Sequence, residues 1–199
     1  MYLYGASGHG KVIKEILESN GIRVDGFVDD NLEKQEYAGL PVYHSTEDVD
    51  DLIVSIGYNE IRKEIAEKAD CHFADAACHV KAVISETARI GDGTVVMAGV
   101  VINADAQIGR HCIINTCALV DHECVIDDYV HIAPKAALCG HVEVGEGTLI
   151  GVGASVAQCR KIGKWCTIGA GAVVVKDIPD GAIVVGVPGK VIGYKDKVK

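Results

Sequence analysis

A six-residue repeat constrains this chain more than any other feature of its sequence. From Ile84 to Val174, every sixth residue is Ile, Val or Leu, which gives 16 consecutive positions in register. A period of six matches neither the 3.6-residue turn of an α-helix nor the two-residue alternation of an ordinary strand. It is typical of a β-solenoid, in which each repeat supplies one short strand and one turn. The sequence therefore predicts a β-solenoid domain over residues 79–181.

The residues between the aliphatic positions predict the shape of this solenoid. The fourth position after each aliphatic is small or apolar in almost every repeat, as at Ala106 and Cys112, and we expect it to let the backbone turn a corner. Glycine directly follows the aliphatic in six repeats, as at Gly109, where we expect tight turns. Three repeats would complete one coil of a triangular prism. About five coils at ~4.8 Å each predict a length of roughly 25 Å.

Composition narrows the class of protein. The chain has 199 residues, enough for one or two domains, and its 49% hydrophobic but only 5% aromatic content predicts an aliphatic core. A net charge of −9 argues against nucleic acid or an anionic membrane as a partner. We expect no membrane insertion, because no apolar run is long enough to span a bilayer, and no signal peptide, because strand-like Tyr2–Tyr4 begins at once.

The eight cysteines predict a reducing environment. None of them forms a Cys-x-x-Cys pair, and Cys112, Cys124 and Cys166 fall on the small position of the repeat. This pattern favours buried free thiols over disulfides or metal ligands. We therefore expect a cytoplasmic protein.

Residues 1–78 follow a different pattern. A strand at 2–4, a Gly-rich turn at 5–11 and apolar residues at helical spacing from Val12 to Leu17 are followed by strands at 24–28 and 52–56 and a second helix. Alternating strands and helices predict a small parallel sheet of Rossmann type. The chain therefore divides into this α/β domain, the solenoid and a C-terminal extension over residues 182–199.

The Gly-rich turn predicts an anion site. Gly5 to Lys11 matches the start of a phosphate-binding P-loop, but Val12 stands where Ser or Thr would hold Mg²⁺, which disfavours nucleotide hydrolysis. Backbone N–H groups of Gly8, His9 and Gly10 at a helix start would still suit a diphosphate. A tight turn without a ligand is the alternative. Asp29 ends the second strand, where such sheets contact ribose or base, although it could equally be a solvated turn residue.

One stretch of the solenoid gathers polar residues suited to acid–base chemistry. It contains Asn115, the run Asp121-His122-Glu123, His131 and His141. Histidine is matched to general-base work near neutral pH, and an adjacent carboxylate would orient its ring. The alternatives are a surface histidine without a role, and a zinc site built from several of the four solenoid histidines. The unequal spacings from His111 onward place these histidines in different parts of successive coils.

Several motifs together resemble one family. The chain begins with G-A-S-G-H-G-K, has F-V-D-D after the second strand and I-G-x-N-x-x-R from Ile56, and continues with the hexapeptide solenoid. This combination resembles the hexapeptide-repeat sugar O-/N-acetyltransferases of the sialic-acid O-acetyltransferase type. Within them it is most similar to the UDP-4-amino-sugar N-acetyltransferases of the UDP-N,N′-diacetylbacillosamine pathway. The resemblance implies a left-handed parallel β-helix, acetyl-CoA as co-substrate and a homotrimer with active sites between neighbouring prisms.

The resemblance also implies roles for individual residues. His122 would be the general base, with Asp121 favoured over Glu123 as the carboxylate that orients it, and no metal would take part. Gly140 would donate its backbone N–H to the oxyanion. The substrate site would include Gly8, His9 and Gly10 near phosphate, Asp29 and Asp30 near uridine, and Gly57, Asn59 and Asn115; the cofactor side would include His131, Gly140, Gly151, Gly169 and Lys190.

The sequence thus predicts transfer of an acetyl group from acetyl-CoA to the amine of a UDP-4-amino-4,6-dideoxy-sugar. We expect direct attack without an acyl-enzyme, because Cys124 occupies a core position and is a poor nucleophile. One alternative is O-acetylation of sialic acid or another bacterial glycan precursor. Another is a non-catalytic nucleotide-sugar binder or assembly subunit, against which the polar cluster around His122 argues.

Overall fold

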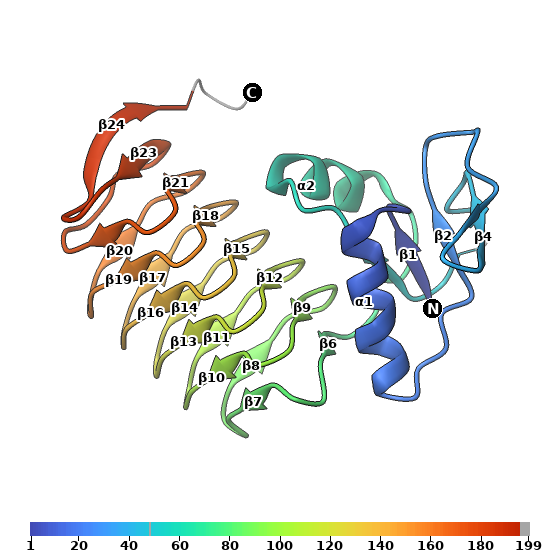
Figure 1. The fold of residues 1–199 in the computed structure, drawn as a ribbon, viewed down its shortest axis with the longest axis horizontal. Helices are drawn as coiled ribbons and strands as arrows, with labels where there is room; N and C mark the ends of the chain where they lie inside the picture. Colours follow the sequence, from blue (N-terminus) through green and yellow to red (C-terminus); the bar gives the residue numbers. More distant parts are fainter. Residues whose placement is uncertain (48, 196–199) are drawn as a thin grey trace.

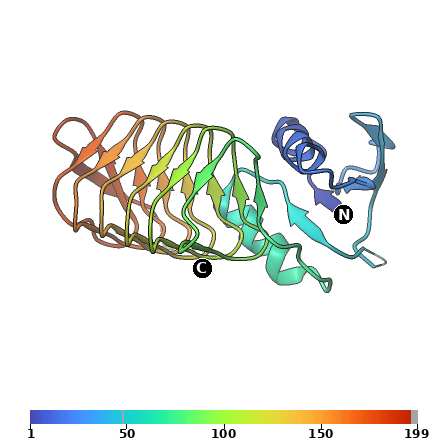
Figure 2. The same cartoon turned by 90° about the horizontal axis from the view of Figure 1, so that it is seen from below.

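The computed structural model describes residues 1–47 and 49–195 as an α/β domain joined to a three-sided prism (Figure 1). Figure 2 shows the coils of the prism stacked one on the next, with the N-terminal domain beside the first coils, drawn in green. No helix within the described residues is long and apolar enough to cross a lipid bilayer. The predicted combination of a Rossmann-like domain with a solenoid is confirmed.

The N-terminal domain is a sheet covered by helices. Strands β4 (Leu40–Tyr43), β2 (Gly26–Val28), β1 (Tyr2–Tyr4) and β5 (Leu52–Val54) lie parallel in that order, and β3 (Glu36–Tyr37) adds antiparallel to β4. Helix α1 (Gly8–Ser19) buries Ile13, Ile16 and Leu17 in a core with Leu3 and Phe27. Helix α2 (Asn59–Lys68) follows β5. The β3–β4 hairpin was not predicted; it turns through Ala38 and Gly39, both at positive φ.

The prism consists of three sheets, each of which takes one strand from every third repeat, and these repeat strands run parallel. The β13 sheet contains β7 (Val83–Ile84), β10 (Val101–Ile102), β13 (Leu119–Val120), β16 (Ala137–Leu138), β19 (Ser155–Val156) and β22 (Val173–Val174). The β14 sheet contains β8 (Arg89–Ile90), β11 (Gln107–Ile108), β14 (Val125–Ile126), β17 (Glu143–Val144) and β20 (Lys161–Ile162). The β15 sheet contains β6 (Ala77–Cys78), β9 (Val95–Val96), β12 (Ile113–Ile114), β15 (His131–Ile132), β18 (Leu149–Ile150), β21 (Thr167–Ile168), β23 (Ala182–Val185) and β24 (Lys190–Tyr194).

The corners of the prism lie one residue earlier than the repeat predicts. The small residue four after each aliphatic, such as Ala106 or Cys112, is fully buried in the core together with the aliphatics. The left-handed corner residue precedes it, as at Asp105 (φ 59°) and Glu123 (φ 57°). Glycines such as Gly109 do not make the corner either. A Cβ there would come within 2.7 Å of the Asp128 nitrogen, so these glycines let one coil approach the next.

The strand pairing of the prism extends beyond the predicted solenoid boundaries. At its start, β6 already pairs with β9, so the β15 sheet begins at Ala77 rather than at residue 79. At its end, β23 pairs parallel with β21, and β24 folds back antiparallel on β23. Within the predicted C-terminal extension, β23 and β24 therefore belong to the β15 sheet, and residues 196–199 lie outside the described residues.

Arg62 and Asn59 join the two domains. The Arg62 side chain is fully buried, and its Nε donates to the His111 carbonyl at 2.7 Å while Nη2 donates to the Tyr129 carbonyl at 2.8 Å. Asn59 Nδ2 donates to the Gly147 carbonyl at 3.0 Å. These three carbonyls belong to successive coils at the corner that leads into the β15 sheet. The N-terminal domain is therefore fixed at this corner.

Candidate active site

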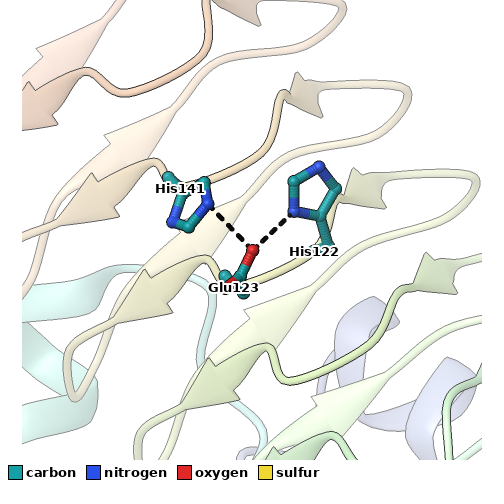
Figure 3. Close-up of side chains that lie close together, drawn as sticks. All are labelled: His122, Glu123 and His141. Carbon is teal, nitrogen blue, oxygen red and sulfur yellow. Dashed lines mark hydrogen bonds and ion pairs between the residues drawn. The ribbon is translucent and has the colours of Figure 1, made fainter.

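His122 and Glu123 form the corner between β13 and β14 (Figure 3). Because the backbone of Glu123 adopts the left-handed conformation, the two adjacent side chains meet, and His122 Nδ1 lies 3.0 Å from Glu123 Oε2. Asp121 Oδ1 instead accepts hydrogen bonds from the His122 backbone N–H at 2.8 Å and from Asn103 Nδ2 at 2.7 Å. In this structure the ring partner of His122 is thus Glu123, and the carboxylate favoured by the resemblance, Asp121, caps the turn.

His141 approaches the same carboxylate from the next coil. Its Nε2 lies 2.8 Å from Glu123 Oε2, and its ring meets that of His122 edge-to-face at 5.4 Å between centroids. All three side chains are about half exposed. The expectation that the solenoid histidines lie apart is wrong for this pair. Since three repeats make one coil, Glu123 and His141 occupy the same corner of consecutive coils, a spacing that could have been found in the sequence.

Gly140 lies directly beneath the His122 ring. A Cβ built on Gly140 would come within 2.5 Å of His122 Nε2, so any side chain there would displace the imidazole. Among the hydrogen bonds of residues 1–47 and 49–195, none is donated by the Gly140 N–H. One coil earlier, Asp121 caps the equivalent N–H of His122, whereas Cys139 precedes Gly140. The Gly140 N–H is therefore available beside the imidazole.

A second group of polar side chains lies between the two domains. The Asn115 amide Nδ2 is 3.0 Å from His131 Nε2, and His9 Nε2 is buried without a hydrogen-bond partner in the described part of the chain. Burial, reinforced by the positive charge of Arg62, lowers the pKa of His9 to about 4. Burial also lowers the pKa of His131 to about 4, with Arg62 and His9 adding to the effect. Both imidazoles are therefore neutral near pH 7.

The N-terminus of α1 lies beside this group. The first N–H groups of the helix, those of Gly8, His9 and Gly10, have no intrahelical partner. The N-cap residue, Ser7, is extended, and its side chain makes no capping hydrogen bond to them. They also carry the positive end of the helix dipole. A Cβ on Gly10 would lie 2.5 Å from the Gly5 carbonyl, so the turn also needs glycine there for packing. The predicted loop therefore has the N–H donors and the positive helix end that suit an anion.

Asp29 and Asp30 have different surroundings. Asp29 Oδ2 accepts hydrogen bonds from the Ala6 N–H at 2.9 Å and from Lys34 Nζ at 2.8 Å. Although burial alone would raise it, these bonds and one from Asn31 hold the pKa of the Asp29 carboxyl below its ordinary value. Asp30 accepts from the Tyr4 hydroxyl and lines a cavity of about 460 Å³ with His44 and Lys68. Asp29 therefore fixes the loop, and Asp30 faces open space.

Other predicted site residues have contacts within the protein. Asn59 also uses its Oδ1, which accepts from Arg62 Nη2 at 2.8 Å, so its amide is engaged in the domain junction. The Gly57 carbonyl accepts from Arg62 Nη1 at 3.4 Å. A Cβ on Gly151 would meet the Ile168 carbonyl at 2.5 Å and one on Gly169 would meet Val185 at 2.9 Å, so both glycines serve coil stacking; Lys190 is exposed at the start of β24.

Comparison with known proteins agrees with this fold. Residues 1–69 match the PglD N-terminal domain family, and residues 87–122 match the bacterial transferase hexapeptide (six repeats) family. PerB from Caulobacter crescentus, solved with CoA and GDP-perosamine, is 39% identical with a TM-score of 0.90, and 96% of each chain is covered. The acetyltransferase domain of PglB from Neisseria gonorrhoeae, solved with acetyl coenzyme A, is 39% identical with a TM-score of 0.87, covering 96% of this chain and 98% of that one.

The curated relatives are matched over part of their length. GDP-perosamine N-acetyltransferase from Escherichia coli O157:H7 is 32% identical over 107 residues, which are 53% of this chain and 48% of that protein. The chain spans between 40% and 55% of the length of the first curated relatives it matches.

The family and structure matches identify the prism as the left-handed parallel β-helix of hexapeptide-repeat transferases. The matches over nearly the whole chain show that it belongs to the family of hexapeptide-repeat, acetyl-CoA-dependent sugar N-acetyltransferases.

Proposed function

We propose that this protein transfers an acetyl group from acetyl-CoA to the amine of a nucleotide-linked amino sugar, with His122 as general base. The observation that carries the proposal is the His122–Glu123 pair above Gly140. Because His122 Nδ1 is held by Glu123, the opposite nitrogen, Nε2, is left to accept a proton. The pair stands in a fold whose relatives bind CoA and GDP-perosamine or acetyl coenzyme A.

The reaction we propose proceeds by direct attack. The sugar amine attacks the acetyl carbonyl carbon while His122 Nε2 takes the proton from nitrogen. Glu123 stabilises the imidazolium that forms, and the Gly140 N–H donates a hydrogen bond to the developing oxyanion. Collapse of the tetrahedral intermediate breaks the carbon–sulfur bond and releases the CoA thiolate, which takes a proton. Each group thus acts on charge that appears only during the reaction.

The cysteines take no covalent part in this proposal. Burial raises the pKa of Cys124, the cysteine next to Glu123, to about 11, so its thiol stays protonated and is a poor acyl acceptor. All eight cysteines are free thiols. Together with the use of acetyl-CoA, this supports a cytoplasmic location.

For the acceptor we propose a UDP-4-amino-4,6-dideoxy-sugar held at the domain junction. The diphosphate would lie at the α1 N-terminus, where Gly8, His9 and Gly10 supply N–H groups and buried Arg62, hydrogen-bonded to carbonyl groups, adds positive charge. The nucleoside would enter the cavity beside Asp30. GDP-perosamine is the second candidate, because PerB was solved in complex with it. Asn115 and His131, which contact each other at the domain junction, would contact the sugar or the acetyl group.

We further propose that the active site is completed in a homotrimer. The outward positions of the β13 sheet are apolar except for Ser155, whereas those of the β14 sheet are exposed and mostly polar. The β13 positions are Val83, Val101, Leu119, Ala137, Ser155 and Val173, and the β14 positions are Arg89, Gln107, Val125, Glu143 and Lys161. Apolar faces favour burial against another copy. His122 borders this face, but the nucleotide domain covers a different corner, so the two halves of a site would come from neighbouring copies.

A direct assay tests the activity. Purified protein is incubated with acetyl-CoA and either a UDP-4-amino-sugar or GDP-perosamine, and free thiol is followed over time. We expect thiol release with one of the two nucleotides and an amide in the product by mass spectrometry. An ester product, or activity on sialic acid alone, would favour the O-acetyltransferase alternative. Nucleotide-sugar binding without thiol release would contradict an enzymatic role.

A complementation experiment tests the shared site. Asp30→Ala and His122→Ala remove the proposed nucleotide contact and the base, and each variant should be inactive alone. If neighbouring copies share a site, unfolding and refolding the two variants together should restore part of the activity. Light scattering should give three chains per particle. A fully active monomer would overturn this part of the proposal.

A further inference from the structure

We propose that His122, Glu123 and His141 form a reversible Zn²⁺ site that inhibits the enzyme. One ligand atom from each of the three side chains lies within 4.8 Å of the other two. Glu123 Oε2 is 3.0 Å from His122 Nδ1 and 2.8 Å from His141 Nε2. Figure 3 shows both rings turned toward the same carboxylate oxygen. Two imidazole nitrogens and one carboxylate oxygen are a donor set typical of zinc with one open position. Because the side chains are half exposed, water would fill that position.

The backbone holds these ligands ready for a metal. His141 N–H donates to the His122 carbonyl at 3.0 Å, and Glu123 N–H donates to the Ala104 carbonyl at 2.9 Å. Glu123 and His141 are both left-handed corner residues on consecutive coils. The donor atoms therefore converge through stacked coils rather than through a flexible loop, so binding requires only a small widening between side chains. Zn²⁺ would replace the two contacts between imidazole nitrogens and the Glu123 carboxylate with metal–ligand bonds.

Binding at this position would switch off the general base. A metal on His122 Nδ1 occupies the lone pair there, so the proton of the neutral ring must reside on Nε2. That nitrogen is the one proposed to accept the proton of the sugar amine, and a protonated Nε2 has no lone pair to do so. This consequence rests on the proposed function, whereas the metal site itself rests only on the three ligands. Zinc is therefore inferred as an inhibitor, and the proposed reaction needs no metal.

A second histidine–carboxylate pair supplies a matched control. His72 Nδ1 lies 2.9 Å from Asp51 Oδ1, and both side chains are more than half exposed. Among the residues that the structure describes, this pair has no third ligand close enough to complete a metal site. His72→Gln thus removes an exposed histidine–carboxylate contact without touching the proposed site.

The test is calorimetric titration of Zn²⁺ into metal-free protein. To remove the exposed thiols of Cys117, Cys139 and Cys159, the titration is run in a background where all three are serine. We expect one Zn²⁺ per chain. His141→Gln and Glu123→Gln should each weaken binding at least ten-fold, and His72→Gln should leave it unchanged. Co²⁺ in place of Zn²⁺ should give the visible absorption of a tetrahedral site, which the same two variants should abolish.

Turnover is measured separately. Zn²⁺ should lower acetyl transfer with the same midpoint as the calorimetric binding, and a chelator should restore it. Absence of saturable binding in the serine background, or binding that His141→Gln and Glu123→Gln leave intact, would overturn the inference. Because calorimetry needs no substrate, zinc binding without any acetyl transfer would count against the proposed function alone. Acetyl transfer that depends on His122 without zinc binding would count against the metal site alone.

Discussion

Two groups of histidines in this protein differ in environment and therefore in what they are suited to do. His9 and His131 lie at the domain junction near Arg62, and burial lowers both pKa values to about 4. His122 and His141 are half exposed at another corner and share Glu123. An imidazole kept neutral beside a buried cation is suited to hydrogen bonding. One that faces solvent and a carboxylate is suited to take a proton, so the local environment decides the role.

The largest effect is expected when the proposed base of the exposed group, His122, is removed. His122→Ala should lower kcat by about 10²- to 10⁴-fold, the usual range for a general base. Steady-state kinetics measure the loss, and calorimetry should show that acetyl-CoA still binds. Near-normal turnover would remove His122 from the proposed mechanism. His131→Ala, from the junction group, should instead raise KM more than it lowers kcat.

The next largest effect is expected on folding stability, when the buried cation of the domain junction, Arg62, is replaced. Arg62→Met leaves buried carbonyls, among them those of His111 and Tyr129, without a donor. Unpaired buried acceptors cost about 1–3 kcal/mol each, and partial relaxation should leave a loss of ~4 kcal/mol. Urea unfolding at fixed protein concentration measures it. Lys63→Met, one position along, removes a less buried ion pair with Glu146 and should cost under about 1 kcal/mol.

A pH-dependent effect should follow from His111, a third histidine at the junction. Its side chain is buried against Phe73 and Tyr129, and burial, with Arg110 and Arg62, lowers its pKa from 6.5 to about 4. Between these values the unfolded chain binds a proton that the folded protein does not. The contribution of His111 to folding stability is therefore complete above about pH 6.5 and falls by ~1.4 kcal/mol per pH unit between there and about pH 4.

His111→Phe should flatten this dependence. The difference in unfolding free energy between the variant and the wild type should shift in favour of the variant by about 2 kcal/mol between pH 7 and pH 5. Unfolding free energies at pH 7, 6 and 5 measure the change. His72→Gln, which replaces an exposed histidine, is the control. Parallel curves for wild type and His111→Phe would show that His111 titrates normally in the folded protein.

The smallest expected effect separates the two carboxylates beside the base. Glu123→Gln removes the charge that faces His122 Nδ1 and should lower kcat about ten-fold, as is common for partners of functional histidines. Asp121→Asn keeps an oxygen for the His122 N–H and should change kcat by less than about two-fold, since a cap of this kind mainly affects stability. The reverse order would restore Asp121 as the orienting carboxylate.

The repeat predicted the prism because a strict period of six leaves few alternatives. It could not place the corners, because the small core residue and the left-handed residue beside it both lie where a turn is expected. The Glu123–His141 contact depends on coil stacking, which only the three-repeat length of a coil encodes. The interdomain role of Arg62 had no local signal, since its partners are backbone carbonyls of His111 and Tyr129, far along the chain.

The N-terminal domain was predicted less completely for a related reason. Its buried strands and α1 carry periodic apolar residues, so their existence followed from the pattern. The β3–β4 hairpin is short and mostly exposed, and its turn at Ala38 uses a residue with no particular turn preference. The Gly-rich turn and the helix that follows it were predicted, because glycines and apolar residues at helical spacing are local features; the anion site at this turn stays a prediction.

The hairpin of β23 and β24 has a consequence for assembly. A parallel solenoid ends in open strand edges, and identical coils from another molecule could pair there and grow into a fibre. In the β15 sheet, β24 reverses direction against β23 and so offers an incoming parallel coil the wrong polarity. Chain reversal at this end thus closes one of the three sheets of the prism to further parallel pairing.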